Sequence, residues 1–252
     1  ASGGKYASPK GLGWVNNLSP YDLDGSMNEP GFKVLHIPDI DFRSSCLTFT
    51  KCLLVLKHWS DMHKAHNPVF ITINAKDEAY EGLTVPEKFT ADSFKELDAA
   101  ILEILGKDKV VIPDDIRGKH ETLEAAVLTG NWPALAKVKG KFFFILNIKG
   151  EKLEAYTDGN PSLKKRMLFV SAEPGTPAAS FLFINDPVKD FPRIRELVSK
   201  GYMVRTLADA GTEEARRNDR SRFQAACESG AQIIATNYYN RSTHFTSEYT
   251  VS

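Results

Sequence analysis

The feature that most constrains the fold is a set of short segments that carry no polar side chains. Phe142 to Leu146 reads Phe-Phe-Phe-Ile-Leu, and Met167 to Val170 and Phe181 to Ile184 are equally apolar. A strand with one face in water alternates polar and apolar residues, so these segments predict strands that are buried on both faces. Strands of this kind are typical of parallel sheets covered by helices. The sequence therefore predicts an α/β fold built on a parallel sheet.

Candidate helices stand between the strands, as such a fold requires. Apolar side chains recur at helical spacing in residues 49–59, and a second helix is predicted from a cap at Asp92 or Ser93 to Leu105. Further helices are predicted over residues 122–128, 191–198 and 212–228, and further strands over residues 32–37, 69–73, 203–206 and 233–236. No glycine-rich phosphate loop follows any of these strands, which argues against a dinucleotide-binding or Walker-type fold.

Charge and length narrow the functional classes. The chain of 252 residues holds 32 Lys and Arg and 32 Asp and Glu, so its net charge is zero. Nucleic-acid binders and polybasic membrane-surface proteins carry an excess of basic residues, so both classes are disfavoured. No apolar run has the length of a transmembrane helix. We predict a single domain over residues 1–252, in which residues 1–30 are irregular because they are rich in Gly, Pro and Asn.

The cysteines are informative through their spacing. Cys46 and Cys52 are six residues apart, whereas Cys227 stands alone. One interpretation is a small disulfide-closed loop formed in an oxidising compartment, and the other is a pair of buried thiols in a cytosolic protein. A metal pair is disfavoured because no other ligand stands at a suitable spacing. We predict the disulfide with Cys227 free, and the glycosylation patterns at Asn17 and Asn240 are compatible with secretion.

Polar and ionisable residues follow each predicted strand. They are His36, Asn74, Lys76, Asn147, Ser171, Glu173, Asn185, Asp186, Arg205, Asp209, Thr236, Asn237 and Tyr239. In a (β/α)8 barrel the carboxyl ends of the strands meet at one mouth that holds the active site, so we predict one shared site. Asn74 and Lys76 share a strand face, and a Lys in such a mouth suits a phosphate group. The alternative is that polarity simply resumes before each loop.

Several blocks of the sequence resemble one known family. They are Gly31-Phe-Lys-Val-Leu-His-Ile-Pro-Asp-Ile-Asp, Phe70-Ile-Thr-Ile-Asn-Ala-Lys-Asp, Ile184-Asn-Asp-Pro and Val204-Arg-Thr-Leu-Ala-Asp. In these blocks, and in order from about Gly3 onward, the chain resembles the calcium-dependent phosphoinositide-specific phospholipase C family of bacteria and fungi. The resemblance implies a (β/α)8 TIM barrel of the phospholipase C-like phosphodiesterase type. It also implies a secreted hydrolase that cleaves a phosphoinositide or a related phosphodiester.

The resemblance assigns roles to the strand-end residues. In the wider superfamily a ring hydroxyl attacks phosphorus with one His as general base, and a second His protonates the leaving oxygen. His36 matches the second His and Lys76 a phosphate-side Lys, so these two are the expected catalytic residues. Asn74 matches a calcium-ligating Glu and is the expected metal ligand, with Ca2+ as the cofactor. The expected substrate-binding residues are Asn147, Asn185, Arg205, Asp209 and Tyr239.

Two motifs of the family do not stand at the end of any predicted strand: His-Asn-Ser-Tyr of its first strand and Glu-Leu-Asp of its second. Two barrel strands, the first His and most calcium ligands are therefore expected to be missing from this chain. One interpretation is a partial or cleaved protein whose N-terminal piece is a separate fragment and partner. The other is a truncated, catalytically inactive module that binds inositol phosphates or lipid head groups. In both, the ligand is a small-molecule or lipid phosphodiester, with no nucleic acid and at most peripheral membrane contact.

Overall fold

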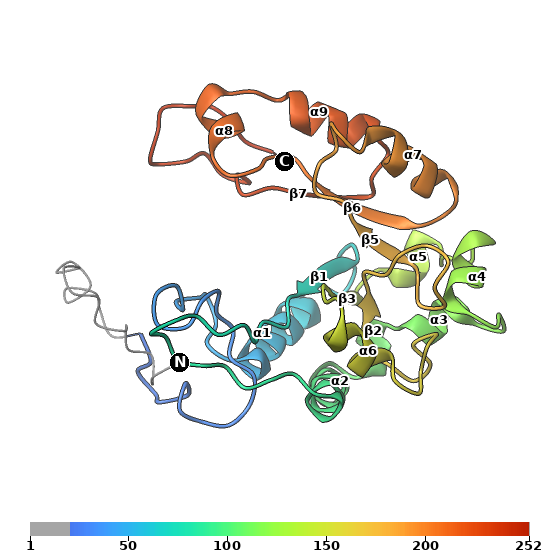
Figure 1. Cartoon of the computed structure of the whole chain (residues 1–252), viewed down its shortest axis with the longest axis horizontal. Coiled ribbons are helices and arrows are strands. Elements are labelled where there is room, and N and C mark those ends of the chain that lie inside the picture. Colours follow the sequence, from blue (N-terminus) through green and yellow to red (C-terminus); the bar gives the residue numbers. More distant parts are fainter. Residues whose placement is uncertain (1–20, 252) are drawn as a thin grey trace.

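The computed structural model describes residues 21–251, in which strands and helices alternate (Figure 1). The strands are β1 Val69–Ile73, β2 Val110–Val111, β3 Phe142–Leu146, β4 Phe169–Val170, β5 Phe181–Phe183, β6 Met203–Leu207 and β7 Ile233–Ala235. The helices are α1 Phe49–Met62, α2 Ala91–Leu105, α3 Pro113–Arg117, α4 Leu123–Leu128, α5 Leu135–Val138, α6 Glu151–Thr157, α7 Phe191–Ser199, α8 Glu213–Arg217 and α9 Ser221–Glu228, with the 3-10 turn η2 Lys107–Lys109. From residue 21 to residue 30 the chain forms only turns and bends.

All pairs between these strands are parallel, as their apolar sequences predict. In one sheet β3 pairs with β1 along its whole length, with β2 at its start and with β4 at its end. The second sheet has the order β5-β6-β7. A parallel bridge between Ser171 and Phe181 connects the two sheets. Because the strands run in the same direction, their carboxyl ends lie along the same edge.

Aromatic side chains join the two sheets into one core. β3 is buried at every position, which is why its sequence has no polar side. On β5, Phe181 is fully buried, and its ring centroid lies 5.0 Å from that of Phe169 and 5.5 Å from that of Trp132. Both contacts are edge-on, the arrangement that aromatic rings prefer at such distances. Buried residues of both sheets belong to the same hydrophobic cluster.

The outermost strands are β1 and β7. Within residues 21–251 each of them pairs with a single neighbouring strand, and no pairing joins one to the other. In Figure 1, β7 lies with α7, α8 and α9 in the upper part of the molecule, and β1 lies with α1 in the lower part. The fold is thus mixed α/β with parallel strands, and closure into a ring is not seen in the described part of the chain.

The structure corrects the expectation of a strand over residues 32–37. This segment makes only isolated antiparallel bridges, from Lys33 to Thr48 and from Ile37 to Asp41. The chain reverses at Asp39, whose φ of 64° lies in the left-handed region, so Ile37 faces Asp41 across a tight turn. Asp tolerates this conformation better than most residues, and the preceding Pro has no N–H to offer a neighbouring strand. His36 therefore lies in a loop and not at a strand end.

Two expected helices differ in detail. α2 begins one residue before Asp92, because Thr90 is its cap and shares reciprocal hydrogen bonds with Ser93. The helix expected over residues 212–228 is divided into α8 and α9, because Asn218 adopts a left-handed conformation with φ of 52° and ends α8. The apolar residues at helical spacing face the protein, since Ala215 and Ala226 are fully buried and Phe223 is partly buried. The helical spacing of apolar residues therefore predicted the buried face of this segment, but not the interruption at Asn218.

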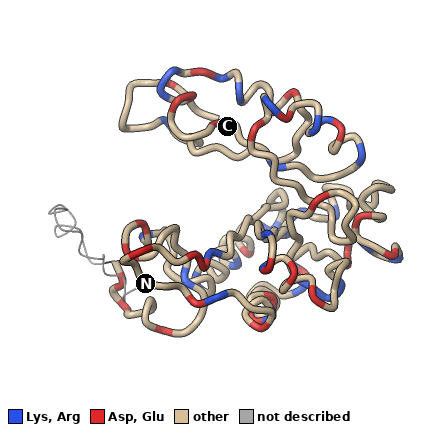
Figure 2. Tube along the Cα trace, in the orientation of Figure 1, with Lys and Arg blue, Asp and Glu red and all other residues tan. Residues whose placement is uncertain are grey.

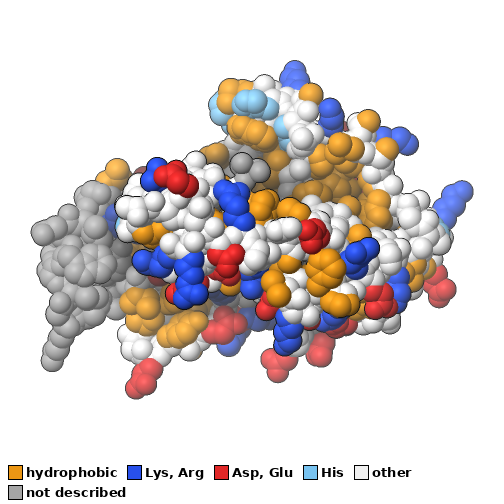
Figure 3. All heavy atoms as spheres, turned by 90° about the horizontal axis from the view of Figure 1, so that it is seen from above, with side chains coloured by type: hydrophobic (Ala, Val, Ile, Leu, Met, Phe, Trp, Pro, Cys, Tyr) orange, Lys and Arg blue, Asp and Glu red, His pale blue; other side chains and the backbone are white. Residues whose placement is uncertain are grey.

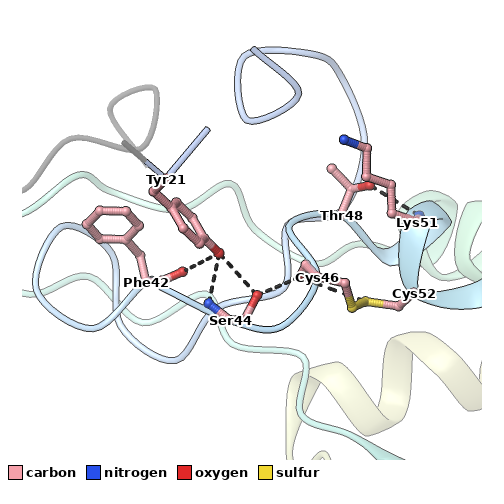
Figure 4. Close-up of a disulfide and its surroundings, with 7 residues drawn as sticks. All are labelled: Tyr21, Phe42, Ser44, Cys46, Thr48, Lys51 and Cys52. Atoms are coloured by element: carbon pink, nitrogen blue, oxygen red, sulfur yellow. Dashed lines mark hydrogen bonds between the residues drawn. A yellow bond between two sulfur atoms is a disulfide. The ribbon is translucent and has the colours of Figure 1, made fainter. Parts of the chain in front are cut away.

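The predicted disulfide is present. Cys46 and Cys52 are bonded with their Cα atoms 5.6 Å apart, which joins the loop before α1 to the first turns of that helix (Figure 4). The hydroxyl of Tyr21 accepts a hydrogen bond from the backbone N–H of Ser44 at 2.8 Å and ties an earlier segment to the same loop. Cys227 is free and exposed. Both parts of the cysteine prediction are thus confirmed.

We expect the double variant Cys46→Ser/Cys52→Ser to lower the free energy of unfolding by about 2 kcal/mol. A loop this short lies near the lower end of the usual range, because closing it removes little entropy from the unfolded chain. Urea unfolding under non-reducing conditions measures the loss, and Cys227→Ser is the matched control without effect. Mass spectrometry that finds three free thiols in the native protein would contradict the assignment.

Candidate active site

The strand-end residues that the sequence singles out lie along the carboxyl edge of the two sheets. Asn74 directly follows β1, Asn147 directly follows β3, and Asn185 lies two residues beyond β5. Arg205 lies within β6, where it is paired with Phe183 on one side and Ile233 on the other. The strands thus deliver amide and guanidinium groups to one edge.

His36 forms a pair with a carboxylate. Its Nδ1 lies 2.6 Å from Oδ2 of Asp41, and both side chains are 61% exposed. The turn at Asp39 makes this contact possible, because it brings residues five apart in the chain face to face. A carboxylate at Nδ1 fixes the ring and leaves Nε2 as the nitrogen that can exchange a proton with a ligand. The sequence did not single out Asp41, whose only signal is its place within the block around His36.

The loop after β1 is fixed by a buried carboxylate that the sequence did not single out. Oδ1 of Asp77 accepts a hydrogen bond from Nζ of Lys152 at 2.7 Å, and Oδ2 accepts one from the backbone N–H of Phe89 at 2.9 Å. Lys152 also donates to the backbone oxygen of Ala75 at 2.9 Å. These contacts hold the residues on both sides of Lys76, so Asp77 and Lys152 are positioning residues.

Lys76 itself points toward the loop of His36. Its side chain is exposed, and its Nζ lies 3.5 Å from the backbone oxygen of His36. The two residues expected to be catalytic are therefore neighbours in space although they are 40 positions apart in the chain. An ammonium group beside an imidazole can offset the charge of an oxyanion while the imidazole transfers a proton.

The network around Lys152 gives a pH-dependent prediction. Burial alone would raise the pKa of Asp77, but hydrogen bonds from Lys152 and Phe89 outweigh it and lower the pKa. The hydrogen bond from Lys152 likewise lowers the pKa of Glu78. A carboxyl whose pKa is lowered by folding stabilises the fold above its unfolded pKa of about 4, and this stabilisation is lost as the pH falls through the folded value.

We therefore expect Lys152→Met to lower the free energy of unfolding by about 1–3 kcal/mol at pH 7, since it leaves a buried carboxylate without its main donor. The loss should shrink as the pH falls below about 4, where the carboxyl groups bind protons in both states. Urea unfolding at pH 7 and at a pH below about 4 measures the loss under both conditions. Lys137→Met, at an exposed position on α5, is the control, and an equal loss at both pH values for Lys152→Met would contradict the ion-pair account.

Asn74 and Asn147 bind each other. Nδ2 of Asn147 donates to Oδ1 of Asn74 at 2.7 Å, and this oxygen is the atom expected to ligate calcium. Within residues 21–251 no group of three or more His, Cys, Asp or Glu side chains is placed to hold a metal ion. Calcium takes about six to eight oxygen ligands, several of them carboxylates. The described residues therefore do not by themselves fit a calcium ion.

Two guanidinium groups meet at Asn185, which lies two residues beyond β5. Nη1 of Arg205 donates to Oδ1 of Asn185 at 2.8 Å, and Nη2 of Arg222 donates to the backbone oxygen of Asn185 at 2.8 Å. Burial lowers the pKa of Arg205, because desolvation disfavours the charged form. Arg222 also approaches Asp186, with Nη1 3.5 Å from Oδ1. The sequence offered no signal for Arg222, which lies on α9 and reaches this point only through the packing of that helix.

Asp209 and Tyr239 have very different environments. The carboxylate of Asp209 is buried and accepts hydrogen bonds from the hydroxyl of Thr236 and, at 2.9 Å, from the backbone N–H of Asn237. Both of its oxygens thus join the end of β6 to the end of β7, the geometry of a positioning residue. Tyr239, beyond β7, is 74% exposed and is available to a ligand.

Direct contacts divide the expected site into groups. His36 lies with Lys76 and Asn74 lies with Asn147, whereas Arg205 lies with Asn185 in the other sheet. Within residues 21–251 no hydrogen bond or ion pair joins the first two groups to the third. The structure thus places the expected residues on one edge of the sheets, in separate local clusters.

The molecular surface carries charges of both signs. Lys and Arg alternate with Asp and Glu along the chain in both parts of the molecule (Figure 2). On the face in Figure 3 they are interspersed with hydrophobic side chains, and no extended basic block is visible there. In the described part of the chain, no helix combines the length and the hydrophobicity needed to cross a bilayer.

The parallel α/β fold brings the ammonium group of Lys76, near the loop of His36, and the guanidinium group of Arg205 to its carboxyl edge, and groups of this kind suit the binding of an oxyanion. Residues 1–252 match the family described as phosphoinositide phospholipase C, Ca2+-dependent. The chain belongs to this family of phosphodiesterases, whose metal is calcium, so the resemblance noted in the sequence is confirmed.

Two solved structures show a similar fold. A Ca2+-dependent phosphatidylinositol-specific phospholipase C from Streptomyces antibioticus is 21% identical, with a TM-score of 0.57, over 77% of this chain and 71% of that protein. A calcium-dependent phosphoinositol-specific phospholipase C from Pseudomonas sp. is 18% identical, with a TM-score of 0.51, over 75% of this chain and 64% of that protein. The chain thus spans less than two thirds of the Pseudomonas enzyme. No match was found among curated proteins.

Proposed function

We propose that this protein hydrolyses the phosphodiester bond of a phosphoinositide or a closely related compound. The observation that carries the proposal is the His36–Asp41 pair, with Nζ of Lys76 near the backbone oxygen of His36. The resemblance assigns His36 and Lys76 to catalysis. The match to the family over residues 1–252 supports the substrate class. The net charge of zero supports a small-molecule or lipid phosphodiester over a nucleic acid.

In this proposal His36 is the general acid. A ring hydroxyl of the substrate attacks phosphorus and loses its proton to a general base expected on the N-terminal fragment, while Nε2 of His36 donates its proton to the leaving oxygen as the bond between that oxygen and phosphorus breaks. Asp41, hydrogen-bonded at Nδ1, orients the ring so that Nε2 is the nitrogen left for the transfer. Lys76 offsets negative charge on the phosphoryl oxygens, and Arg205 is proposed to contact the substrate's anionic group from the second sheet. Asn147, Asn185 and Tyr239 are proposed as further substrate contacts.

We propose that β1, β3, β4, β5, β6 and β7 are six strands of a (β/α)8 barrel that forms a single domain over residues 1–252, and that the other two strands are missing from the described part of the chain; β2 pairs only with the start of β3. The outer strands β1 and β7 support this, because in the described residues each has a neighbouring strand on one side only, whereas every strand of a closed barrel has one on both sides. A separate N-terminal fragment of the same protein is the proposed source of the missing strands and of the acidic calcium ligands. The disulfide supports secretion of the mature protein.

One observation favours a second candidate, a catalytically inactive module that binds inositol phosphates or lipid head groups. The described residues contain no acidic cluster for a metal ion, and Asn74 stands where the family places a calcium-ligating Glu. A neutral amide at that position weakens a calcium site. Such a module would keep Lys76 and Arg205 for binding while turnover is lost.

Turnover and binding measured on the same sample separate the two candidates. Phosphatidylinositol vesicles are incubated with the protein, with calcium or with excess chelator, and released inositol phosphate is quantified. The proposal predicts release that falls sharply with chelator. Binding of soluble inositol phosphate without any release, with or without calcium, would replace hydrolysis with the binding module.

A further inference from the structure

A pocket that shares no lining residue with the candidate active site carries cationic groups that the proposed reaction does not use. It lies between α2, the end of α6 and the loop of residues 158–166, and its volume is about 390 Å³. Small-molecule sites usually have volumes of about 300–1,000 Å³, so this pocket is large enough for a compact ligand. Its ionisable lining residues are Lys95, Asp158, Lys164, Lys165 and Arg166.

Arg166 is a buried cation with unused hydrogen-bonding capacity. It is 6% exposed, its Nη1 donates to Oδ2 of Asp98 at 3.2 Å, and its guanidinium lies 4.5 Å from the ring centroid of Tyr156. Its Nε is buried and has no hydrogen-bond partner in the described part of the chain. A buried donor without a partner is rare and costly. Arg166 lines the pocket, so its guanidinium adds a positive charge to the lining, and in the described residues its one side-chain ion pair is with Asp98, outside the lining.

The guanidinium is held rigidly. Asp98 accepts hydrogen bonds from the hydroxyl of Tyr156 at 2.9 Å and from the backbone N–H of Met167 at 3.0 Å. These donors fix the carboxylate that in turn orients Arg166. An arginine whose geometry is set before binding loses little conformational entropy when it contacts an anion.

The loop that carries the two lysines is equally constrained. Leu163 is fully buried in the core, and the backbone N–H of Lys165 donates to Oδ2 of Asp114 at 2.9 Å. Leu163 and Lys165 have φ values of 56° and 64°, a left-handed conformation that side chains with a Cβ rarely adopt. Such a conformation persists only where surrounding contacts enforce it, as these anchors do. The loop therefore presents Lys164 and Lys165 in a defined place.

The charge balance of the pocket is positive. Lys95 is paired with Asp92 at 2.7 Å, whereas Lys164 and Lys165 have no ion pair in residues 21–251. Asp158 is the single carboxylate in the lining. Ammonium and guanidinium groups that converge on one pocket suit an oxyanion with several acceptor oxygens. We propose that this pocket binds a phosphate group, carried either by a free phosphate compound or by an anionic lipid head group.

The test uses two probes and two double variants. Inorganic phosphate is titrated into the protein at constant ionic strength, with chloride as the comparison anion, and amide shifts are followed by NMR. Binding to phosphatidylcholine vesicles with and without phosphatidic acid is measured by co-sedimentation. The variants are Lys164→Gln/Lys165→Gln in the pocket and Lys137→Gln/Lys139→Gln at exposed positions elsewhere, with thermal unfolding as the check on folding.

We expect one of two results. Either phosphate, but not chloride, shifts the amide signals of residues 91–95 and 158–166, or the protein binds vesicles that contain phosphatidic acid and does not bind vesicles of phosphatidylcholine only. The first result identifies a free phosphate compound and the second a lipid head group. The pocket variant should weaken binding at least about tenfold, because charge-assisted hydrogen bonds to phosphate are lost, while the control variant should not. Absence of binding to both probes, or equal weakening in both variants, would overturn the proposal.

Discussion

Replacing His36 with Ala is expected to lower turnover of a phosphodiester substrate by about 10²–10⁴-fold, the usual effect of losing one general acid or base. The reason is that the imidazole paired with Asp41 is the group proposed to protonate the leaving oxygen. The fold should persist, because the side chain of His36 is exposed and its contacts are confined to one turn. Steady-state kinetics and thermal unfolding of the same preparation measure both effects.

Two further variants sharpen this prediction. A substrate with a chemically activated leaving group needs little protonation, so it should partly restore turnover in His36→Ala but not in Lys76→Ala, where the loss is electrostatic. His58→Ala, at an exposed position on α1, is the matched control and should leave turnover unchanged. Equal restoration in the His36 and Lys76 variants, or full activity of His36→Ala, would show that the two roles are assigned wrongly.

Replacing Phe181 with Ala is expected to lower the free energy of unfolding by about 3–5 kcal/mol, the range for truncating a fully buried Phe. Phe181 lies where the two sheets meet, and its ring contacts the rings of Phe70, Phe169 and Trp132. Truncation removes these contacts and leaves a cavity at the joint, which the short strands on either side cannot close. Urea unfolding followed by circular dichroism measures the loss.

The matched control for Phe181 is Leu102→Ala on α2. Leu102 is an exposed hydrophobic residue, so its truncation should change the free energy of unfolding by no more than about 0.5 kcal/mol. A loss below about 1 kcal/mol for Phe181→Ala would contradict a shared core. In that event the two sheets would have to be stable independently of each other.

The sequence predicted the fold class well where burial dictates composition. β3 is apolar at each position because it is covered on both faces, so it could be recognised as a central parallel strand. The same logic identified β5. It failed for residues 32–37, where an apolar stretch is folded back by the turn at Asp39. Composition reports burial, and a tight turn depends on a few backbone angles that composition does not encode.

The candidate site was predictable where one residue ends one strand, and not where packing brings distant residues together. Asn74 and Asn147 could be placed at the same edge from their strands alone, and they are in contact. Lys152 and Arg222 could not, because they lie on helices and reach Asp77 and Asn185 through side-chain contacts. Periodicity places a helix against a sheet, but it does not state which loop a long cationic side chain will reach.

The measurement that tests the central claim most directly is a phosphorus-31 NMR time course with phosphatidylinositol and calcium. If a ring hydroxyl attacks phosphorus and His36 protonates the leaving oxygen, a cyclic phosphodiester should appear first and a phosphomonoester should follow from its hydrolysis. In His36→Ala the first step should be slowed by about 10²–10⁴-fold. A phosphomonoester that forms without any cyclic precursor, or an unchanged substrate signal despite binding, would contradict the account.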